Sequence, residues 1–367
     1  MVQPFRLPFG KRDRPPADVT IAPAGPPPSE LAPPPDQPLY AGPYRLERQI
    51  GTGGESHVWL ATHAGNGTTA VVKVQRSDVY PDRLRRETAV LHALLAVRTP
   101  NVVRLLPAGN DGVVSREPGV LRTPSGEELL YCVLELLPCE AKRNVVQQGP
   151  MKRADLLEVC FALRAALRVM HLDFRLLHND LKPDNIVAWR DPLDARLKVR
   201  LLDFGQTALL MPHPRVALPC VTPEPALRYV YVYGSFPYMA PERWHGQVVY
   251  ESSPSVSPNA PPHGDHWPQA AIVDERADQW AFAASIFELL TGRPLVVAAR
   301  GSQYRDECRR IITSGAYAST VQEARLPARL KAVLERGLAL NPSDRYAPAP
   351  SVSSLDFLCR DLEMALA

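Results

Sequence analysis

Two short clusters in the middle of the chain carry side chains suited to phosphate and metal chemistry. The first cluster, 178–185, has the sequence His-Asn-Asp-Leu-Lys-Pro-Asp-Asn, and the second is Asp203-Phe204-Gly205. A carboxylate near a hydroxyl group can accept its proton, and a second carboxylate with an amide can hold a divalent cation. Mg²⁺ takes few protein oxygens and fills its remaining positions with water and phosphate, so one Asp plus one Asn suits it better than a closed protein cage.

A glycine-rich turn lies nearer the amino terminus. It contains Gly51, Gly53 and Gly54 and is flanked by the apolar residues Ile50 and Val58. Glycine lets backbone N–H groups approach phosphate oxygens closely. Glycine-rich hairpins are also common without any phosphate, so taken alone this turn has an ordinary structural explanation.

Lys73 lies within a run of valines, where an unpaired cation would be costly. Glu87 is the candidate partner because it lies on the apolar stripe of the helix expected next, between Leu84 and Leu91. An inward acid and an inward base on adjacent elements predict an ion pair. For these two residues alone, coincidence is the simpler alternative.

Taken in order, these motifs resemble the signature of the eukaryotic-type protein kinases: glycine loop, strand lysine, helix glutamate, catalytic loop and Asp-Phe-Gly. The resemblance continues in Gly234–Glu242, which is similar to the end of the activation segment in Ser/Thr kinases. Asp278 resembles the start of the central helix of the large lobe, and Arg345 matches the arginine that pairs with the Ala-Pro-Glu glutamate, here Glu242. The resemblance extends from Tyr44 to the carboxyl end, and the high Ala, Arg and Pro content favours a bacterial member.

The resemblance implies a nucleotide site for ATP. Residues expected at its phosphates, with Glu87 positioning Lys73, are Gly51, Gly53, Gly54, Lys73 and Glu87. Apolar residues expected around adenine are Ile50, Val58, Val71 and Val187, with Leu134 as the gatekeeper. The backbone of the linker Glu135–Leu137 would hydrogen-bond adenine.

The same resemblance implies the catalytic and metal residues. Asp180 would orient the substrate hydroxyl and accept its proton, and Lys182 would neutralise the γ-phosphate. Asn185 and Asp203 would bind Mg²⁺, or Mn²⁺ in its place. Lys182 together with Ser235 favours Ser/Thr over Tyr as the acceptor in protein substrates.

Two groups of elements must position these residues. Hydrophobic alternation predicts strands at 44–50, 58–61, 70–74, 102–106 and 131–137, with one helix at 82–95. Apolar residues at helical spacing predict helices at 153–172, around 280–290, at 326–340 and at 353–367. The expected fold is therefore α+β and two-lobed, protein-kinase-like, with a small β-rich lobe at 43–135, a hinge at 135–139 and a mainly helical lobe at 140–367.

Proline marks two segments outside these lobes. Residues 1–42 are expected to be a disordered or polyproline-type tail, which composition explains as a linker; docking of a partner through its proline runs is the alternative. Residues 248–271 are expected to be a surface insertion, explained as a solvated loop, with substrate or partner docking as the alternative.

Composition excludes several function classes. The net charge of +3, from 42 basic and 39 acidic residues, gives no reason to expect a nucleic-acid partner. We find neither an apolar run of membrane-spanning length nor a secretory signal, and the six cysteines form no Cys-x-x-Cys pair. We therefore expect reduced thiols and a cytoplasmic location.

Departures from the family pattern generate one hypothesis about regulation. Asn179 replaces the arginine that commonly precedes the catalytic Asp and clamps an activation-loop phosphate, a contact that Asn cannot make. Thr207 and Thr222 are the only non-tyrosine hydroxyls in 206–233. We expect activity that does not require phosphorylation of this loop.

The expected function is an active Ser/Thr protein kinase, with two alternatives left open. Ser56 and Glu55 in the variant glycine loop, with Asn179, are the support for a nucleotide-binding pseudokinase or scaffold. The third reading is a small-molecule kinase, against which the Ala-Pro-Glu segment ending at Glu242 counts.

Overall fold

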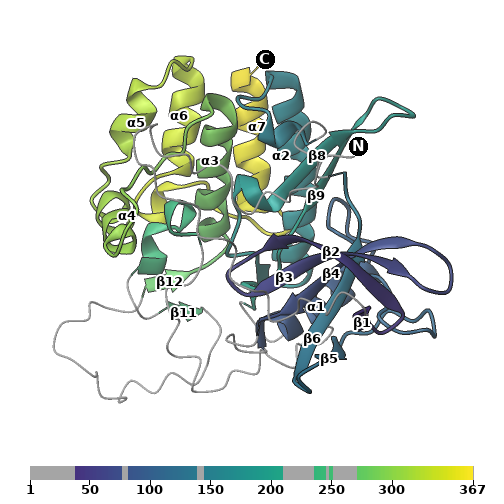
Figure 1. Ribbon diagram of the computed structural model, residues 1–367. Helices are drawn as coiled ribbons and strands as arrows, with labels where there is room; N and C mark the ends of the chain where they lie inside the picture. Colours follow the sequence, from purple (N-terminus) through teal and green to yellow (C-terminus); the bar gives the residue numbers. More distant parts are fainter. Residues whose placement is uncertain are drawn as a thin grey trace, which may run out of the picture.

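The computed structural model of this chain describes residues 38–76, 82–138, 144–209, 235–244, 248–250 and 271–366. They form two lobes, a small one built on a sheet and a larger one built mainly of helices (Figure 1). The two-lobed α+β fold predicted from the sequence is thereby confirmed. The expected site residues lie in both lobes, so the contact between the lobes decides whether they meet.

The small lobe is a six-stranded antiparallel sheet in the order β1-β2-β3-β4-β6-β5, with one helix packed on β6. Its elements are β1 (Tyr40–Ala41), β2 (Tyr44–Thr52), β3 (Ser56–His63), β4 (Thr69–Gln75), α1 (Asp82–Ala96), β5 (Gly119–Arg122) and β6 (Glu128–Glu135). Strand alternation gives the sheet two different faces. Val71 packs in the large core shared with the other lobe, whereas Val72 and Val74 pack in a second cluster on the opposite face. Lys73 shares the face of Val71 and therefore points toward the lobe interface.

The larger lobe is organised around one helix that is buried on all sides. Its helices are α2 (Arg153–Arg168), which continues as a π-helical turn (Val169–Asp173), α3 (Arg276–Thr291), α4 (Tyr304–Thr313), α5 (Ala318–Glu323), α6 (Ala328–Gly337) and α7 (Ser354–Leu366). Helix α3 is the central one, since its residues from Ala277 to Leu289 are all buried. It packs against α2, α6 and α7 (Figure 1).

Short pairs of strands form in the part of the chain between α2 and α3. They are β7 (Leu176–Leu177) with β10 (Ala208–Leu209), β8 (Ile186–Arg190) with β9 (Leu197–Leu201), and β11 (Val248–Tyr250) with β12 (Ala271–Val273). The β8–β9 hairpin separates the 178–185 cluster from Asp203. The β11–β12 pair joins the two ends of the expected surface insertion, whose middle, 251–270, lies outside the described residues.

The end of α3 follows the predicted stop signal. Gly292 has a left-handed backbone, φ 70°, and its N–H donates to the carbonyl of Glu288. A Cβ at this position would lie 2.9 Å from the Cγ of Pro150, so both the conformation and the available space require glycine.

The prediction of a strand at 102–106 is wrong. These residues form isolated bridges, Val102 to Leu201 and Leu105 to Leu134, in place of a ladder. The segment crosses from the β8–β9 hairpin to the small-lobe sheet, so its backbone bonds are divided between the two lobes. Periodicity in the sequence does not distinguish such a crossing from a strand.

Other boundaries also differ from expectation. The sheet begins inside the segment assigned to the tail: Leu39 and Ala41 are buried on its outer face, so β1 belongs to the small lobe. The remainder of that segment, 1–37, lies outside the described residues. Strand β5 and helices α4 and α5 were not predicted, since they are short, with four, ten and six residues. Among the described helices, none combines the length and the apolar character needed to cross a bilayer.

A buried ion pair ties the end of the activation segment to the last part of the chain. Arg345 is fully buried and donates two bonds of 2.8 Å to the carboxylate of Glu242, as the resemblance implied. It also donates to the carbonyls of Arg276, Ala339 and Leu340, so all five of its N–H groups have partners.

Removing one partner of this pair should destabilise the protein strongly. Glu242→Gln would leave the guanidinium of Arg345 buried without its counter-charge, and we expect a loss of about 3–5 kcal/mol in the free energy of unfolding, measured by urea denaturation. The matched control is Glu128→Gln, which removes the partner of Arg122 from an exposed pair. It should change the free energy by about 0.5 kcal/mol or less. Equal effects of the two substitutions would contradict the structural role of the buried pair.

Candidate active site

The predicted ion pair of the small lobe is confirmed. The Nζ of Lys73, on β4, lies 2.6 Å from Oε2 of Glu87 on α1. It also lies 3.3 Å from Oδ1 of Asp203, which belongs to the other lobe. The side chains of Lys73 and Glu87 are 11% and 3% exposed. One cation therefore holds a carboxylate from each lobe.

The charges of this triad stabilise one another. Burial would lower the pKa of Lys73, but the carboxylates of Asp203 and Glu87 outweigh it and raise that pKa. Burial would raise the pKa of Asp203, but Lys73 and Lys182 hold it at about 2. For Glu87, burial raises the pKa against the opposing effect of Lys73. Lys73 and Asp203 are therefore both charged over the physiological pH range.

The 178–185 cluster folds into a second polar group. Asp180 accepts bonds from Lys182 Nζ at 2.9 Å and from Asn185 Nδ2 at 3.0 Å, both on Oδ2. Its other oxygen accepts from the backbone N–H of Ser235 at 3.0 Å. Lys182 also donates to the hydroxyl of Ser235 at 2.5 Å. The start of the described 235–244 segment is thus docked onto Asp180 and Lys182.

A buried carboxylate beneath the cluster fixes its backbone. Asp278, in the first turn of α3, accepts from the N–H groups of His178 and Asn179 at 2.7 and 2.9 Å. His171 is 2.9 Å from the same carboxylate. Burial opposes the charge of Asp278, but the bond from His171 lowers its pKa, and in return Asp278 raises the pKa of His171 against burial. His171 was not predicted, although its position four residues after Leu167, on the apolar face of the helix, was an available signal.

Backbone conformation also marks this region. Asn179 and Asp203 both have left-handed backbones, with φ of 65° and 63°. Asn and Asp tolerate this conformation better than other residues with a side chain, and such strain is concentrated at functional sites. Asn179 therefore suits its backbone, even though it cannot clamp a phosphate as arginine would.

The donor set of the cluster fits a magnesium ion. Asn185 uses its Nδ2 on Asp180, which turns its Oδ1 away from that bond, and this buried oxygen has no hydrogen-bond partner within the described part of the chain. Asp203 is ionised and is anchored on only one oxygen by Lys73. An amide oxygen and a carboxylate are hard oxygen ligands of the kind that Mg²⁺ binds.

The predicted adenine-lining residues all belong to the one hydrophobic core that spans the two lobes. They are each less than one-tenth exposed and comprise Ile50, Val58, Val71, Leu134 and Val187; Leu137, from the expected linker, is buried in the same core. In the linker, the N–H of Glu135 already donates to the carbonyl of Arg104, and its carboxylate binds Arg104 and Arg200. The N–H of Glu135 is therefore already used within the protein and is not available to adenine.

The glycine-rich turn connects β2 to β3 at 53–55. The N–H of Gly53 donates to the carbonyl of Ser56 at 2.8 Å, while Gly51 pairs with Val58 in the strand register. A Cβ on Gly54 would meet nothing within 4 Å, so the protein's own packing does not require glycine there. Glycine at the tip leaves room for a bound group to approach the backbone.

Two contacts at this site come from residues that the sequence did not single out. Arg83, in the first turn of α1, forms an ion pair with Glu55 at the tip of the glycine-rich turn. Arg243 donates to the carbonyl of Asn179 at 2.7 Å. Arg83 lies among other charged residues and Arg243 directly follows the Ala-Pro-Glu motif, and no sequence pattern marked either of them as a partner.

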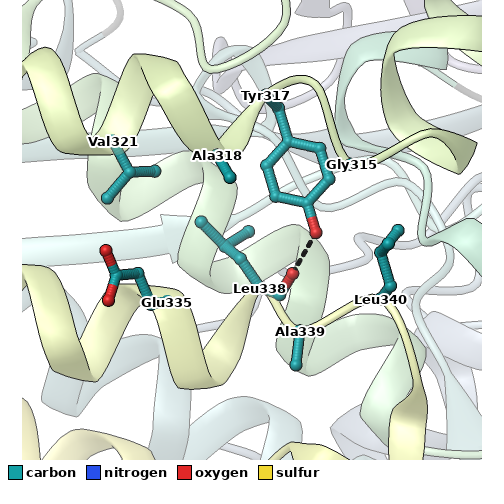
Figure 2. Close-up of a pocket in the computed structure, with 8 residues that line it drawn as sticks. All are labelled: Gly315, Tyr317, Ala318, Val321, Glu335, Leu338, Ala339 and Leu340. Carbon is teal, nitrogen blue, oxygen red and sulfur yellow. Dashed lines mark hydrogen bonds between the residues drawn. The ribbon is translucent and has the colours of Figure 1, made fainter.

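A separate apolar pocket of about 240 Å³ lies in the helical lobe, away from these residues (Figure 2). It lies between α5, α6 and the turn that precedes α5, and the hydroxyl of Tyr317 donates to the carbonyl of Leu338 at its edge. Its other lining residues are Gly315, Ala318, Val321, Glu335, Ala339 and Leu340. None of the residues predicted to act on a nucleotide lines it.

Comparison with known proteins matches the part of the chain that holds these residues. The family model described as the protein kinase domain matches residues 44–258, which include every predicted site residue. A probable serine/threonine-protein kinase PknB of Bifidobacterium longum is 27% identical over 262 residues, covering 70% of this chain and 31% of the relative. Serine/threonine-protein kinase PknH of Mycobacterium tuberculosis is 27% identical over 318 residues, covering 84% and 40%. Serine/threonine-protein kinase Pkn1 of Myxococcus xanthus is 29% identical over 315 residues, covering 84% and 37%. The chain thus spans well under half the length of these curated relatives.

The depressed pKa of Asp203 predicts a pH-dependent contribution to stability. A carboxyl group whose pKa falls to about 2 on folding stabilises the protein above its ordinary pKa, and this contribution is lost as the pH falls toward 2. We expect Asp203→Asn to lower the free energy of unfolding by about 2 kcal/mol at pH 6, and this difference to shrink between pH 4 and pH 2. Urea denaturation at several pH values measures it. Asp173→Asn, at an exposed carboxylate, is the control; a difference for Asp203→Asn that does not change with pH would contradict the assignment.

Proposed function

Because this chain belongs to the protein kinase family, we propose that it transfers the γ-phosphoryl group of ATP to Ser or Thr hydroxyls of protein substrates. The observation that carries the proposal is the convergence of charged groups from separate segments. Lys73 contacts Asp203 across the lobes, and Asp180 contacts both Lys182 and Asn185. Phosphoryl transfer depends on positioning and charge stabilisation, which such a cluster supplies.

Each residue has a role suited to its chemistry. Lys73, held by Glu87, would bind the α- and β-phosphates, and Gly51, Gly53 and Gly54 would cover them with backbone N–H groups. Asn185 and Asp203 would hold Mg²⁺, which neutralises phosphate charge when bound. Asp180 would accept the proton of the acceptor hydroxyl, while Lys182 stabilises charge on the transferred group.

The acceptor specificity is supported by the contact between Lys182 and Ser235. The lysine lies between the carboxylate of Asp180 and the hydroxyl of Ser235, so the segment that precedes the Ala-Pro-Glu motif lies directly against the proposed base. Both residues follow the pattern of Ser/Thr kinases. The relatives named above are also serine/threonine-protein kinases.

We further propose that one kinase domain begins at β1, a little before the expected boundary at 43, and continues to 367, with the linker 135–139 as the hinge. Its substrates would be proteins, encountered in the cytoplasm. Cys132, Cys160, Cys308 and Cys359 are buried free thiols, which agrees with a reducing compartment. The part of the 1–37 tail that could dock a partner lies outside the described residues.

Independence from activation-loop phosphorylation has support from the burial of one threonine and from two hydrogen bonds. Thr207 is fully buried, so its hydroxyl cannot be reached by another kinase without unfolding this segment. Arg243 holds the carbonyl of Asn179, and Asn179 Nδ2 donates to the carbonyl of Gln206 at 3.2 Å. These bonds tie the catalytic loop to both ends of the activation segment without any phosphate. The other candidate acceptor, Thr222, lies outside the described residues.

The proposed activity can be tested with labelled ATP and Mg²⁺ on the purified chain and a generic protein substrate. Asp180→Asn and Lys73→Met should each lower the rate by about 10²-fold or more, because each removes a group that acts in the transition state. Asp173→Asn, an exposed carboxylate of the same lobe, should retain the wild-type rate. Phosphoamino-acid analysis should show phosphoserine and phosphothreonine. A wild-type chain that binds ATP but is as inactive as the variants would establish the pseudokinase alternative.

Regulation can be tested separately with the chain purified after phosphatase treatment. We expect the initial rate to stay within about twofold of the untreated protein, and Thr222→Ala to behave in the same way, because the catalytic loop does not depend on a phosphate contact. Mass spectrometry would verify that the loop is unphosphorylated. A large loss that returns on rephosphorylation would overturn the independence.

A further inference from the structure

Glu55, at the tip of the glycine-rich turn, makes contacts that neither the fold nor the proposed chemistry requires. Its Oε1 pairs with Arg83 of α1 and accepts a bond of 2.9 Å from Nε2 of Gln206. Its Oε2 lies over Gly205, where a Cβ would be only 3.5 Å away. One carboxylate thus connects the turn, helix α1 and the residues of the Asp-Phe-Gly motif.

This ion pair is not a freely solvated surface pair. The side chains of Arg83 and Glu55 are 18% and 33% exposed. Both line a small cavity of about 20 Å³, together with Ser56, Lys73, Gln75, Leu84, Glu87 and Gly205. Partial desolvation and a third hydrogen-bonding partner strengthen a charge pair relative to an exposed one.

The position of Arg83 on α1 gives the contact its significance. Arg83 and Glu87 are four residues apart, so their side chains lie on the same face of the helix. Glu87 binds Lys73 from the middle of the sheet, and Arg83 binds Glu55 from the turn. The same helix face therefore holds both the lysine and the tip of the turn.

Charge considerations explain why an acid is tolerated at this tip. A free carboxylate above the phosphate site would repel the phosphates of ATP. Arg83 neutralises it and draws it toward α1 and Gln206. The side chain of Glu55 thus holds the turn against α1 and Gln206.

We propose that Glu55 is a positioning residue that latches the glycine-rich turn to α1 through Arg83 and so retains bound nucleotide. Because Arg83 and Glu87 lie on the same helix, the contact of Arg83 with Glu55 and the contact of Glu87 with Lys73 form together. This inference rests on the proposed function, since it assumes that a nucleotide lies beneath the turn. Its direct consequence is slow release of ATP and ADP.

A double-mutant cycle tests the latch. Glu55→Gln and Arg83→Met each remove one charge with little change of shape, and the third variant combines them. We expect each single variant to weaken ATP·Mg²⁺ affinity, by isothermal titration, and to speed the release of a fluorescent ADP, by stopped flow, by about three- to fivefold. The double variant should equal either single variant within about twofold, because both break the same contact.

The matched control is Arg85→Met. Arg85 carries the same charge on the same helix but lies two residues from Arg83, which turns it to another side of α1. It should leave both nucleotide measurements at wild-type values. In all variants the melting temperature without nucleotide should stay within about 2 °C of wild type, which separates a latch from a general loss of stability.

The outcomes distinguish this inference from the proposed function. Single variants with unchanged affinity and release, or a double variant whose effect is the product of the two single effects, would overturn the latch while leaving the kinase proposal intact. A wild-type chain that binds no nucleotide would instead refute the proposed function, and with it the premise of the latch. A kcat that rises while the KM for ATP also rises would support the latch, since faster product release raises turnover where release is limiting.

Discussion

The buried charge of Lys73 is the constraint from which the arrangement of this molecule follows. A cation in the middle of a valine-rich strand is tolerated only when carboxylates compensate it. Glu87 supplies one from α1 and Asp203 supplies the other from the far lobe. If either partner moved away, a largely desolvated charge would remain, at a cost of several kcal/mol. The two lobes are therefore held together at the point where a phosphate chain would bind.

A second buried charge has the same effect beneath the catalytic loop. Asp278 is a carboxylate buried in the helical core, and two backbone N–H groups and His171 satisfy it. Because those N–H groups belong to His178 and Asn179, the charge that must be compensated also fixes the loop that ends in Asp180. Fixed dipoles and charges in a shielded site favour catalysis, since they need not reorganise during the reaction. In both places, a buried charge determines where flexible segments lie.

The need to pair buried charges also explains which residues could be predicted from the sequence. Lys73 and Glu87 were predictable because a charge in an apolar pattern requires a partner, and the catalytic cluster because its spacing is specific. The conformation of segment 102–106 was not predictable, because its backbone hydrogen bonds are divided between the two lobes. Hydrophobic alternation alone does not show which segment such residues pair with. Arg83 and Arg243 were not predictable either. Arg83 lies among other charged residues, where one more arginine carries no pattern, and Arg243 lies between Glu242 and Trp244 with no motif of its own. Only the three-dimensional arrangement shows that Arg83 meets a carboxylate and Arg243 a carbonyl.

Two ion pairs on one face of α1 connect that helix both to Lys73 on β4 and to Glu55 in the glycine-rich turn. A helix held at positions four residues apart cannot rotate about its axis without disturbing both contacts, whereas a single pair would act as a pivot. Rotation of α1 would therefore release the turn at Glu55 together with the lysine at Glu87. The contacts of Glu55 and of Lys73, the residues proposed to lie at the phosphates, are therefore coupled through α1. Under the proposed function, this dependence would let the position of α1 regulate the site, which agrees with the proposal that no phosphate on the activation segment is required.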